Sequence, residues 1–334
     1  MIEKGNRTFV FSLAYRPFEG GAEIAAREVM ERLEDRRFAV FTYRFDRRWP
    51  QEERSSRIEV VRVGKGGRNT DYYGGRFMKS LRYIAHAFWA AEGEHREEPC
   101  AVIWAIMSAY AGAATLLFKL RHPRIPLLLT LQEGDAEAHI VRRVGLLYPL
   151  WRLLFRRADH IQVISIYLRD FARRHGATCP ISVVPNGVHT ERFKYQNRTH
   201  GASRPGGPVL ITTSRLVRKN GIDIMLQAVA ILRHSGFSVQ AIIVGSGPEE
   251  RFLVALAREL EITNSVTFAG QVSPERIPAY LEQADIFIRP SRSEGLGTSF
   301  LEAMAAGLPV IGTPVGGIPD FLKDRETGLR VQPE

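Results

Sequence analysis

The sequence has little of what marks secreted, membrane-spanning or metal-binding proteins. Two cysteines, Cys100 and Cys179, occur among 334 residues, so no disulfide framework is available and a reducing, cytoplasmic compartment is expected. No run approaches the roughly 20 apolar residues of a spanning helix, and the N-terminus lacks the form of a signal peptide. There is no short-period repeat, and no Asp-x-Asp stands beside a supporting acidic cluster. The last absence disfavours a metal-held ligand.

The composition is that of a globular protein with enough apolar material for two cores. Hydrophobic residues make up 45% of the chain and charged residues 25%. A chain of 334 residues is too long for one ordinary core, so two domains are expected.

The net charge of +10 is unevenly distributed. Residues 1–195 carry the whole excess, mostly as arginine, while residues 196–334 are neutral. The first half could therefore face an anionic phospholipid surface, a lipid-phosphate acceptor or a nucleic acid. Nucleic acid is the weakest of these, because stacking aromatics do not interleave with the basic residues. Arginine usage from a GC-rich genome explains the excess equally well.

Short apolar runs alternate with longer amphipathic runs along the whole chain, which is typical of doubly wound α/β domains. Strands are expected at 8–14, 39–43, 58–63, 101–106, 127–131, 160–164, 182–184, 209–213, 239–244, 265–268, 285–289 and 309–312. Amphipathic helices are expected between them, for example at 22–33, 74–91, 222–233 and 249–260. Residues 195–208 have the Gly, Pro, Ser and Asn content of a linker. The expected domains are thus 1–195 and 196–334, facing each other across a ligand-binding cleft.

The most informative stretch is residues 291–307, SRSEGLGTSFLEAMAAG. It reads as a glycine-containing turn between a strand and a helix, a geometry that binds phosphate through unpaired N–H groups and the helix dipole. Glu294 and Glu302 stand in the same stretch and would be out of place if phosphate were the only ligand. A sugar nucleotide explains both features, because its hydroxyls donate hydrogen bonds to carboxylates.

Two other segments of the second half also follow predicted strands and could contribute to the same ligand-binding site. Residues 212–221, TTSRLVRKNG, place Arg215 and Lys219 at the end of a strand, where two cations could neutralise a diphosphate leaving group. A solvated basic loop is the alternative. Gly245 and Gly247, in VGSGP, follow the next strand and could serve a ligand or simply tight packing.

The first half contributes two weaker candidates. Gly20 and Gly21, in FEGGAE, would allow close backbone approach to a ligand, although a Gly-Gly pair is often a plain turn. The segment lacks G-x-G-x-x-G, which disfavours a nicotinamide cofactor. At the end of the fifth strand, QEGD supplies Glu133 and Asp135 as a general base or acceptor-binding group, or Asp135 as a helix cap.

Together these pieces resemble the retaining glycosyltransferases of the GT-B fold, in particular family 4. The quoted segments are FEGGAE, VPNGVHTERF, SRLVRKNG, VGSGP and SEGLGTSFLEAMAAGLPVIGTPVGGIPD, in order along nearly the whole chain. The resemblance implies two Rossmann-like domains, the first binding the acceptor and the second binding the nucleotide-sugar donor. Members of the family usually continue with one or two further helices, so it also implies a truncated second domain whose C-terminal helices are missing.

The resemblance also implies roles for residues of the glutamate block. Glu294 would contact hydroxyls of the donor sugar, and Glu302 would bind the nucleotide ribose. Gly297, Thr298 and Ser299 would offer backbone N–H groups to the diphosphate.

Outside that block, the resemblance implies that Arg215 and a nearby lysine clamp the diphosphate. Gly20 and Gly21 would approach the donor from the other domain, and Val272 would border the base. The glycines Gly245 and Gly247 would also lie at the nucleotide.

The chain departs from the family pattern at two positions. The usual lysine falls at Asn220 in a gapless alignment, with Lys219 one position earlier. The family often has a histidine near Gln132, where this chain has only Glu133 and Asp135 to offer. The role of that histidine near the sugar's primary hydroxyl is therefore open.

The function that the resemblance implies is hexosyl transfer to a glycan or lipid-linked acceptor in cell-envelope or polysaccharide synthesis. The transfer would be retaining and would require no metal or other cofactor, with the nucleotide sugar as co-substrate. The alternatives are a sugar-nucleotide epimerase of the same fold and a non-catalytic sugar-nucleotide-binding subunit.

One segment bears on the acceptor. Residues 141–157, VRRVGLLYPLWRLLFRR, combine large apolar side chains with arginines at both ends. The segment could lie on an anionic membrane surface, making the protein peripheral on the inner face of the cell membrane. It could equally be a buried helix with exposed arginine ends.

Overall fold

The computed structural model describes residues 6–17, 20–67, 76–193 and 206–333. The chain forms two α/β units, one made of Met1–Glu133 with Glu137–Pro185 and the other of Gly134–Ala136 with Asn186–Glu334. The change of unit at residue 185 comes before the boundary expected at 195, because Phe193 packs in the core of the second unit. The expected linker, 195–208, lies outside the described residues as far as residue 205.

The first unit contains an eight-stranded sheet in the order β3-β4-β2-β1-β5-β6-β7-β8. β3 pairs antiparallel with β4, and the other neighbours pair in parallel. The strands are β1 (Arg7–Phe11), β2 (Arg37–Tyr43), β3 (Glu52–Arg54), β4 (Ile58–Val63), β5 (Val102–Ile106), β6 (Leu127–Leu131), β7 (His160–Val163) and β8 (Ile181–Val183).

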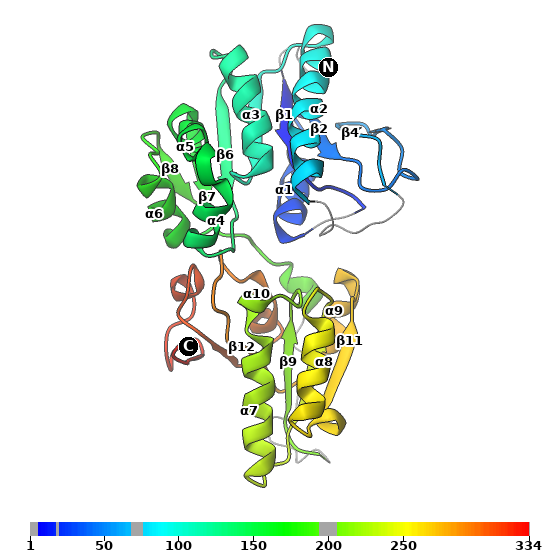
Figure 1. The fold of residues 1–334 in the computed structure, drawn as a ribbon, viewed down its shortest axis with the longest axis vertical. Helices are drawn as coiled ribbons and strands as arrows, with labels where there is room; N and C mark the ends of the chain where they lie inside the picture. Colours follow the sequence, from blue (N-terminus) through cyan, green and yellow to red (C-terminus); the bar gives the residue numbers. More distant parts are fainter. Residues whose placement is uncertain (1–5, 18–19, 68–75, 194–205, 334) are drawn as a thin grey trace. The chain divides into compact units, whose positions relative to one another are not determined.

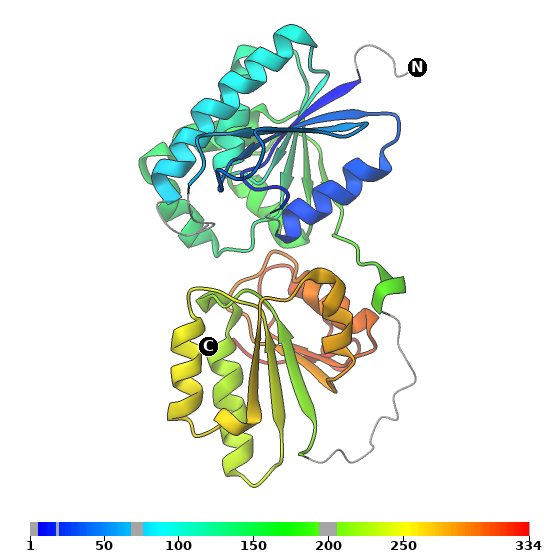
Figure 2. The same ribbon diagram turned by 90° about the vertical axis from the view of Figure 1, so that its right-hand side faces the viewer.

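Helices cover both faces of this sheet, as Figures 1 and 2 show for α1 and α2. They are α1 (Gly21–Arg32), α2 (Arg76–Glu97), α3 (Tyr110–Arg121), α4 (Glu137–Val144), α5 (Tyr148–Arg157) and α6 (Ile166–Arg174), with a 3₁₀ turn η1 (Gly145–Leu147). Successive residues of β1 point to opposite faces. Val10 packs in the core that includes Met30 of α1, while Phe9 and Phe11 contact the ring of Phe118 in α3. The nearly continuous apolar strands are therefore buried on both sides.

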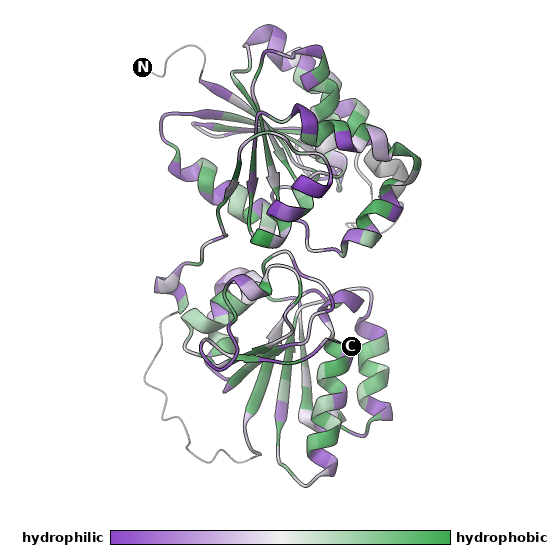
Figure 3. Ribbon diagram, turned by 90° about the vertical axis from the view of Figure 1, so that its left-hand side faces the viewer, coloured by the Kyte–Doolittle hydropathy of each residue, from purple (hydrophilic) through white to green (hydrophobic). Residues whose placement is uncertain are grey.

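The second unit has a six-stranded parallel sheet in the order β11-β10-β9-β12-β13-β14. Its strands are mostly green in the hydropathy colouring of Figure 3. They are β9 (Val209–Thr213), β10 (Gln240–Val244), β11 (Val266–Gly270), β12 (Ile286–Arg289), β13 (Val310–Gly312) and β14 (Leu329–Arg330).

Two separate cores lie on the two faces of the second sheet. Leu210 belongs to the core formed with α7 and α8, and its neighbour Ile211 belongs to the core formed with α10. The helices and turns are η2 (Thr190–Phe193), η3 (Arg218–Asn220), α7 (Ile222–His234), α8 (Glu250–Glu259), η4 (Thr263–Ser265), η5 (Pro274–Arg276), α9 (Ile277–Leu281), α10 (Thr298–Ala305) and η6 (Ile318–Asp320).

The doubly wound α/β architecture predicted from the sequence is confirmed in both units, and each expected strand is present. Two short strands were not predicted, β3 and β14. The helix expected at 74–91 begins at Arg76 and continues to Glu97; its first two expected residues lie outside the described residues. In each unit, parallel strands bring the loops at their carboxyl ends to one edge, which is where ligands bind in such sheets.

Candidate functional site

The central feature of the second unit is the turn 291–297, which joins β12 to α10. Pro290 follows the last strand residue and cannot continue the ladder of hydrogen bonds. Gly297 precedes α10 with φ 89°, a left-handed conformation, and a Cβ there would lie 3.0 Å from the Phe300 ring. Glycine therefore allows the helix to begin immediately after the turn. The first N–H groups of the helix, at Thr298 and Ser299, have no intrahelical partner and are directed outward.

Glu294 is buried in this turn and is held from two sides. Its Oε1 accepts hydrogen bonds from Arg289 Nη2, in a short contact, and from Ser291 Oγ at 3.2 Å. The same guanidinium donates through Nη1 to Ser299 Oγ at 2.6 Å. Two residues predicted from the sequence, Glu294 and Ser299, are thus brought together by Arg289, which was not predicted as a site residue.

Glu302, in the middle of α10, has a different environment from Glu294. Burial raises its pKa to about 7, and the positive charge of Arg289 opposes that shift. A carboxyl group with this pKa is easily converted to either protonation state near neutral pH. The two glutamates of the block are therefore chemically distinct, one bound to a cation and the other mainly desolvated.

The loop after β9 supplies the predicted cations. Arg215 is exposed and Lys219, in η3, is half-buried. Asn220 is buried, and its Nδ2 donates to the Arg215 carbonyl oxygen at 2.7 Å. Asn220 therefore braces the loop from inside, and the role of the family lysine for Lys219 stays a prediction.

Arg292 connects this cationic loop to the turn that carries Glu294. Its two Nη atoms form a bidentate ion pair with Asp223 of α7, at 2.8 Å each. Its backbone N–H donates to the Lys219 carbonyl oxygen at 2.7 Å. Burial opposes ionisation of Asp223, but the hydrogen bonds and charge of Arg292 outweigh it and keep the pKa of Asp223 below its usual value. The cationic loop and the glutamate turn therefore form one connected structure.

Two further loops pack against these segments. Gly316 lies against the turn, since a Cβ there would be 1.7 Å from the Glu294 carbonyl oxygen. A Cβ at Gly245 would be 1.8 Å from the Ser214 carbonyl oxygen, and one at Gly247 would be 2.3 Å from that of Leu216. These two glycines allow the loop with Arg215 to pack closely on the end of β10. This packing is the second of the two explanations that the sequence left open for them.

Val272 lies just beyond the end of β11 in the second unit. Its side chain is partly buried and packs against the core that includes Phe287 and Phe300. The resemblance implies that Val272 borders the nucleotide base, and this stays a prediction.

The candidates of the first unit are less exposed than the sequence suggested. Glu133 follows β6 and is buried, with Oε1 accepting from Ser108 N at 2.5 Å and Ser108 Oγ at 2.7 Å. Burial raises its pKa, although hydrogen bonds from Ser108 oppose the shift. These bonds hold a turn in which Met107 has φ 70°, an uncommon conformation for a bulky residue. Glu133 thus braces the turn after β5, and Asp135 lies two residues further on, in the segment Gly134–Ala136 that groups with the second unit.

The predicted glycines of the first unit stand at the start of α1. Gly20 is the N-cap, and its N–H donates to Oε2 of Glu23 at 2.9 Å. A Cβ at Gly21 would meet no heavy atom of the described residues within 4 Å. The position beside Gly21 is therefore open as far as the described residues go, and Phe18 and Glu19 lie outside them.

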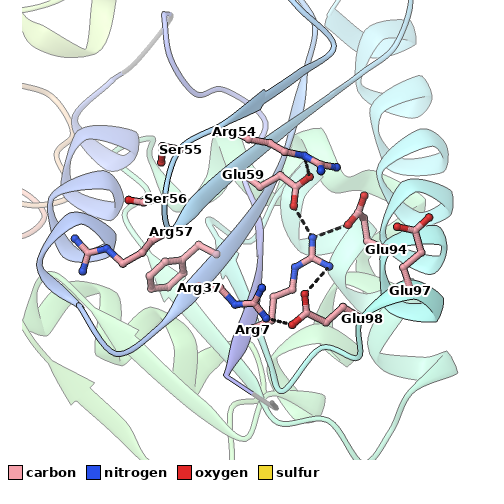
Figure 4. A pocket seen from close by; sticks show the side chains of 11 residues that line it. Arg7, Arg37, Arg54, Ser55, Ser56, Arg57, Glu59, Glu94, Glu97 and Glu98 are labelled. Atoms are coloured by element: carbon pink, nitrogen blue, oxygen red, sulfur yellow. Dashed lines mark hydrogen bonds and ion pairs between the residues drawn. The ribbon is translucent and has the colours of Figure 1, made fainter. Parts of the chain in front are cut away.

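A polar cavity of about 430 Å³ lies at the amino ends of β1 and β2 in the first sheet (Figure 4). Arg7 lies at its centre and pairs with Glu59 at 2.6 Å, Glu94 at 2.5 Å and Glu98 at 3.9 Å. Arg37 pairs with Glu98 as well. The cavity is thus lined by an ion-pair network and lies at the opposite end of the strands from their carboxyl ends, where ligands are expected.

Two general searches cover the described residues only. Over this part of the chain, no group of three or more His, Cys, Asp or Glu side chains is placed to hold a metal ion. None of the helices in it combines the length and the apolar character needed to cross a membrane.

Family models match almost the whole chain. Residues 20–187 match the model described as glycosyl transferase 4-like domain, and residues 194–334 match that described as glycosyl transferases group 1.

Curated relatives align with this chain over 193 to 287 residues. The GDP-mannose-dependent alpha-(1-6)-phosphatidylinositol monomannoside mannosyltransferase of Mycobacterium tuberculosis is 34% identical over 200 residues, covering 55% of this chain and 52% of the relative. The amylovoran biosynthesis glycosyltransferase AmsK of Erwinia amylovora is 30% identical over 287 residues, covering 81% of this chain and 67% of the relative. The chain spans about half the length of the first of these relatives.

Solved structures share the fold at low sequence identity. The sucrose-phosphate synthase of Thermosynechococcus elongatus has a TM-score of 0.81 and 23% identity, over 98% of this chain and 86% of that chain. HepE of Anabaena in complex with UDP-glucose has a TM-score of 0.74 and 19% identity, over 98% and 85%.

Proposed function

The chain belongs to the glycosyl transferases of group 1, with the GT-B fold, and from this premise we propose that it transfers a hexosyl group from a nucleotide-diphosphate sugar to an acceptor hydroxyl. The observation that carries the proposal is the joined pair of loops in the second unit. One loop holds the carboxylate of Glu294 beside the N-terminus of α10, and the other holds Arg215 and Lys219. Arg292 connects the two loops. Such an arrangement offers hydrogen-bond acceptors to a sugar and positive charge to a diphosphate.

The proposed reaction proceeds with retention at the anomeric carbon and without a metal. The bond from the anomeric carbon to the diphosphate breaks while the acceptor oxygen bonds to the same face. The acceptor's proton passes to the departing diphosphate oxygen. Arg215, Lys219 and the N–H groups at the start of α10 stabilise the negative charge that develops on that diphosphate. Positioning and charge stabilisation thus supply the catalysis, and no protein nucleophile is needed.

Several relatives support the substrate classes that we propose. They are named as a GDP-mannose-dependent phosphatidylinositol monomannoside mannosyltransferase, a D-inositol 3-phosphate glycosyltransferase, and glycosyltransferases of colanic acid and amylovoran biosynthesis. We propose a nucleotide-diphosphate hexose as donor and a lipid-linked or polysaccharide acceptor for this chain. We place the reaction in cell-envelope or polysaccharide synthesis.

A donor screen tests the proposal directly. The purified protein is incubated with GDP-mannose, UDP-glucose or ADP-glucose and membrane lipid extract or oligosaccharide acceptors. We expect thermal stabilisation by one nucleotide class, a new glycosidic product with the donor's anomeric configuration by NMR, and activity that survives EDTA. An isomerised nucleotide sugar without a new glycoside would indicate an epimerase, and binding without turnover would indicate a non-catalytic subunit.

The raised pKa of Glu302 leads to a pH-dependent prediction. Ribose hydroxyls donate to the ionised carboxylate, so binding should favour the deprotonated form, which is populated above pH 7. We expect the affinity for the nucleotide sugar to rise by roughly tenfold from about pH 6 to about pH 8. Isothermal titration calorimetry across this range measures it.

The matched variant is Glu302→Gln, which cannot ionise and should show a nearly flat profile. The pH dependence of protein stability provides an independent check of the direction of the Glu302 pKa shift. The folded protein holds the Glu302 proton up to about pH 7, whereas the unfolded chain releases it near 4.5. The carboxyl group therefore favours folding at low pH, and this contribution is lost as pH rises through 7. If wild type and variant have parallel pH profiles for both binding and stability, Glu302 is not the titrating group.

We also propose that the first unit docks on an anionic membrane through the segment 141–157. The segment is α4, η1 and α5 in sequence, so it is not one continuous helix. Trp151, Leu154 and Phe155 are buried, which accounts for part of its apolar character. In contrast, Leu146 is 100% exposed, and Leu147 and Leu150 are also exposed. Exposed arginines flank them, at 142, 143, 156 and 157.

Exposed leucines between arginines are suited to an anionic lipid interface. We expect the protein to co-sediment with vesicles containing anionic lipid but not with neutral vesicles. Leu146→Glu with Leu147→Glu should abolish co-sedimentation without affecting the fold, because both side chains are exposed. Ile231→Glu, at an exposed position of the second unit, serves as the control. Equal binding of all these proteins, or binding to none of the vesicles, would contradict the membrane proposal.

A further inference from the structure

Arg289 is a charged residue at the end of an otherwise apolar strand. It is only 6% exposed, and β12 places it beneath the turn that carries Glu294. Its Nη1 donates to the Thr213 carbonyl oxygen at 3.2 Å and to Ser299 Oγ at 2.6 Å, and its Nη2 donates to Glu294. The guanidinium carbon lies 5.2 Å from the centroid of the fully buried Phe300 ring. The guanidinium is therefore fixed by contacts with β9, the turn and α10.

The hydrogen bonds of Glu294 are distributed unequally between its two oxygens. Oε1 accepts from both Arg289 and Ser291, whereas Oε2 has no hydrogen-bond partner among the described residues. A carboxylate anchored through one oxygen presents the other with its lone pairs free. Because both charged groups are buried, separating them would leave each one poorly solvated.

We propose that Arg289 is the positioning residue of this site. It holds Glu294 by one oxygen so that the other can accept a hydroxyl of the donor sugar. Through Ser299 it fixes the first turn of α10 relative to that carboxylate, and so sets the spacing between the sugar-binding group and the diphosphate-binding N–H groups. The identity of the ligand, a donor sugar, rests on the proposed function. The contact between Arg289 and Glu294 rests on the geometry of Arg289 alone.

Arginine fits this role better than lysine. The forked guanidinium reaches Thr213, Ser299 and Glu294 at once, in a fixed plane. An ammonium group is a single point on a flexible chain and cannot reproduce that plane. Arg289→Lys should therefore restore charge but only part of the geometry.

The first test needs no substrate. Arg289→Met leaves the buried Glu294 without its cation, and we expect the Tm to fall by roughly 10 °C. In the double variant with Glu294→Gln neither charge remains, so at least half of that loss should be recovered. Arg330→Met is the control, because Arg330 Nε donates to the Leu322 carbonyl oxygen in the same unit. Glu294→Gln should not recover the loss caused by that variant. Additive effects of Arg289→Met and Glu294→Gln would overturn the proposal.

The second test compares affinities for the nucleoside diphosphate and for the nucleotide sugar. Arg289→Met should bind the nucleoside diphosphate within about threefold of wild type, but lose about tenfold in affinity for the nucleotide sugar. Arg289→Lys should lie between the two proteins. Equal losses for both ligands would show that Arg289 only supports the fold and would overturn the positioning role. If the wild-type protein binds no nucleotide sugar, the proposed function fails. The first test, which compares the two single variants with the double variant in the absence of substrate, still decides whether Arg289 positions Glu294.

Discussion

Replacing Glu294 with glutamine is expected to lower the rate of hexosyl transfer by about 100-fold or more. Glutamine keeps the carbonyl oxygen that Arg289 and Ser291 need, so the turn should stay in place. Its amide group cannot, however, accept a sugar hydroxyl where Oε2 now stands. It also lacks the negative charge that would stabilise positive charge developing on the sugar as the bond to the diphosphate breaks.

The measurement is the initial rate of product formation at saturating donor. Affinity for the nucleoside diphosphate should remain close to that of wild type, because Glu302, Arg215 and Lys219 are unchanged. Glu326→Gln, an exposed glutamate of the same unit, is the control and should be fully active. Near-wild-type turnover of Glu294→Gln would remove Glu294 from the catalytic residues.

The fold could be predicted from the sequence to the extent that burial produces apolar runs. Strands with continuous Val, Ile, Leu and Phe, such as β6 and β9, were predicted to the residue. β3 was missed because Glu-Glu-Arg is fully exposed and carries no apolar signal. Its strand conformation comes from antiparallel pairing with β4, which a local pattern does not record.

The site could be predicted only where its chemistry is local in the sequence. Glu294 and Gly297 belong to one turn, Ser299 lies in the first turn of the helix that follows, and all three were predicted together. Arg292 was missed because its partner Asp223 is 69 residues away. Arg289 was missed although Glu294 and Ser299 are only 5 and 10 residues away. The one available signal was a charge at the end of the apolar run IFIR, which a buried strand does not accept without a partner.

Two local motifs have neighbours that the sequence does not reveal. Gly245 and Gly247 were open to a ligand or to tight packing, and neighbouring carbonyl oxygens lie where their side chains would be. Glu133 was expected as a general base or acceptor-binding group, which stays a prediction, and its Oε1 holds the Ser108 turn inside the first unit. In both cases the deciding neighbour belongs to another strand-end loop.

A loss of stability comparable to that of Arg289→Met is expected from Arg7→Met in the first unit. Arg7 is buried between Glu59 of β4, Glu94 of α2 and Glu98, which directly follows α2 (Figure 4). Removing it leaves three carboxylates close together, with Arg54 still paired to Glu59 and Arg37 to Glu98 but without the central cation that they share. We expect the free energy of unfolding to fall by about 3 kcal/mol, the lower end for breaking a buried pair, because the glutamates retain partial exposure. That corresponds to a decrease in Tm of roughly 6–12 °C.

Arg32→Met is the matched control for burial. Arg32 pairs with Glu28 at 2.6 Å, the same distance as Arg7 to Glu59, but its side chain is 59% exposed against 7% for Arg7. An exposed pair contributes less than about 1 kcal/mol, so this variant should melt close to wild type. Circular dichroism at several salt concentrations separates the two cases, because salt screens an exposed pair more strongly than a buried one. If Arg7→Met and Arg32→Met destabilise the protein equally, the network at the start of β1 contributes no more than a surface ion pair, and the first sheet depends on its apolar core alone.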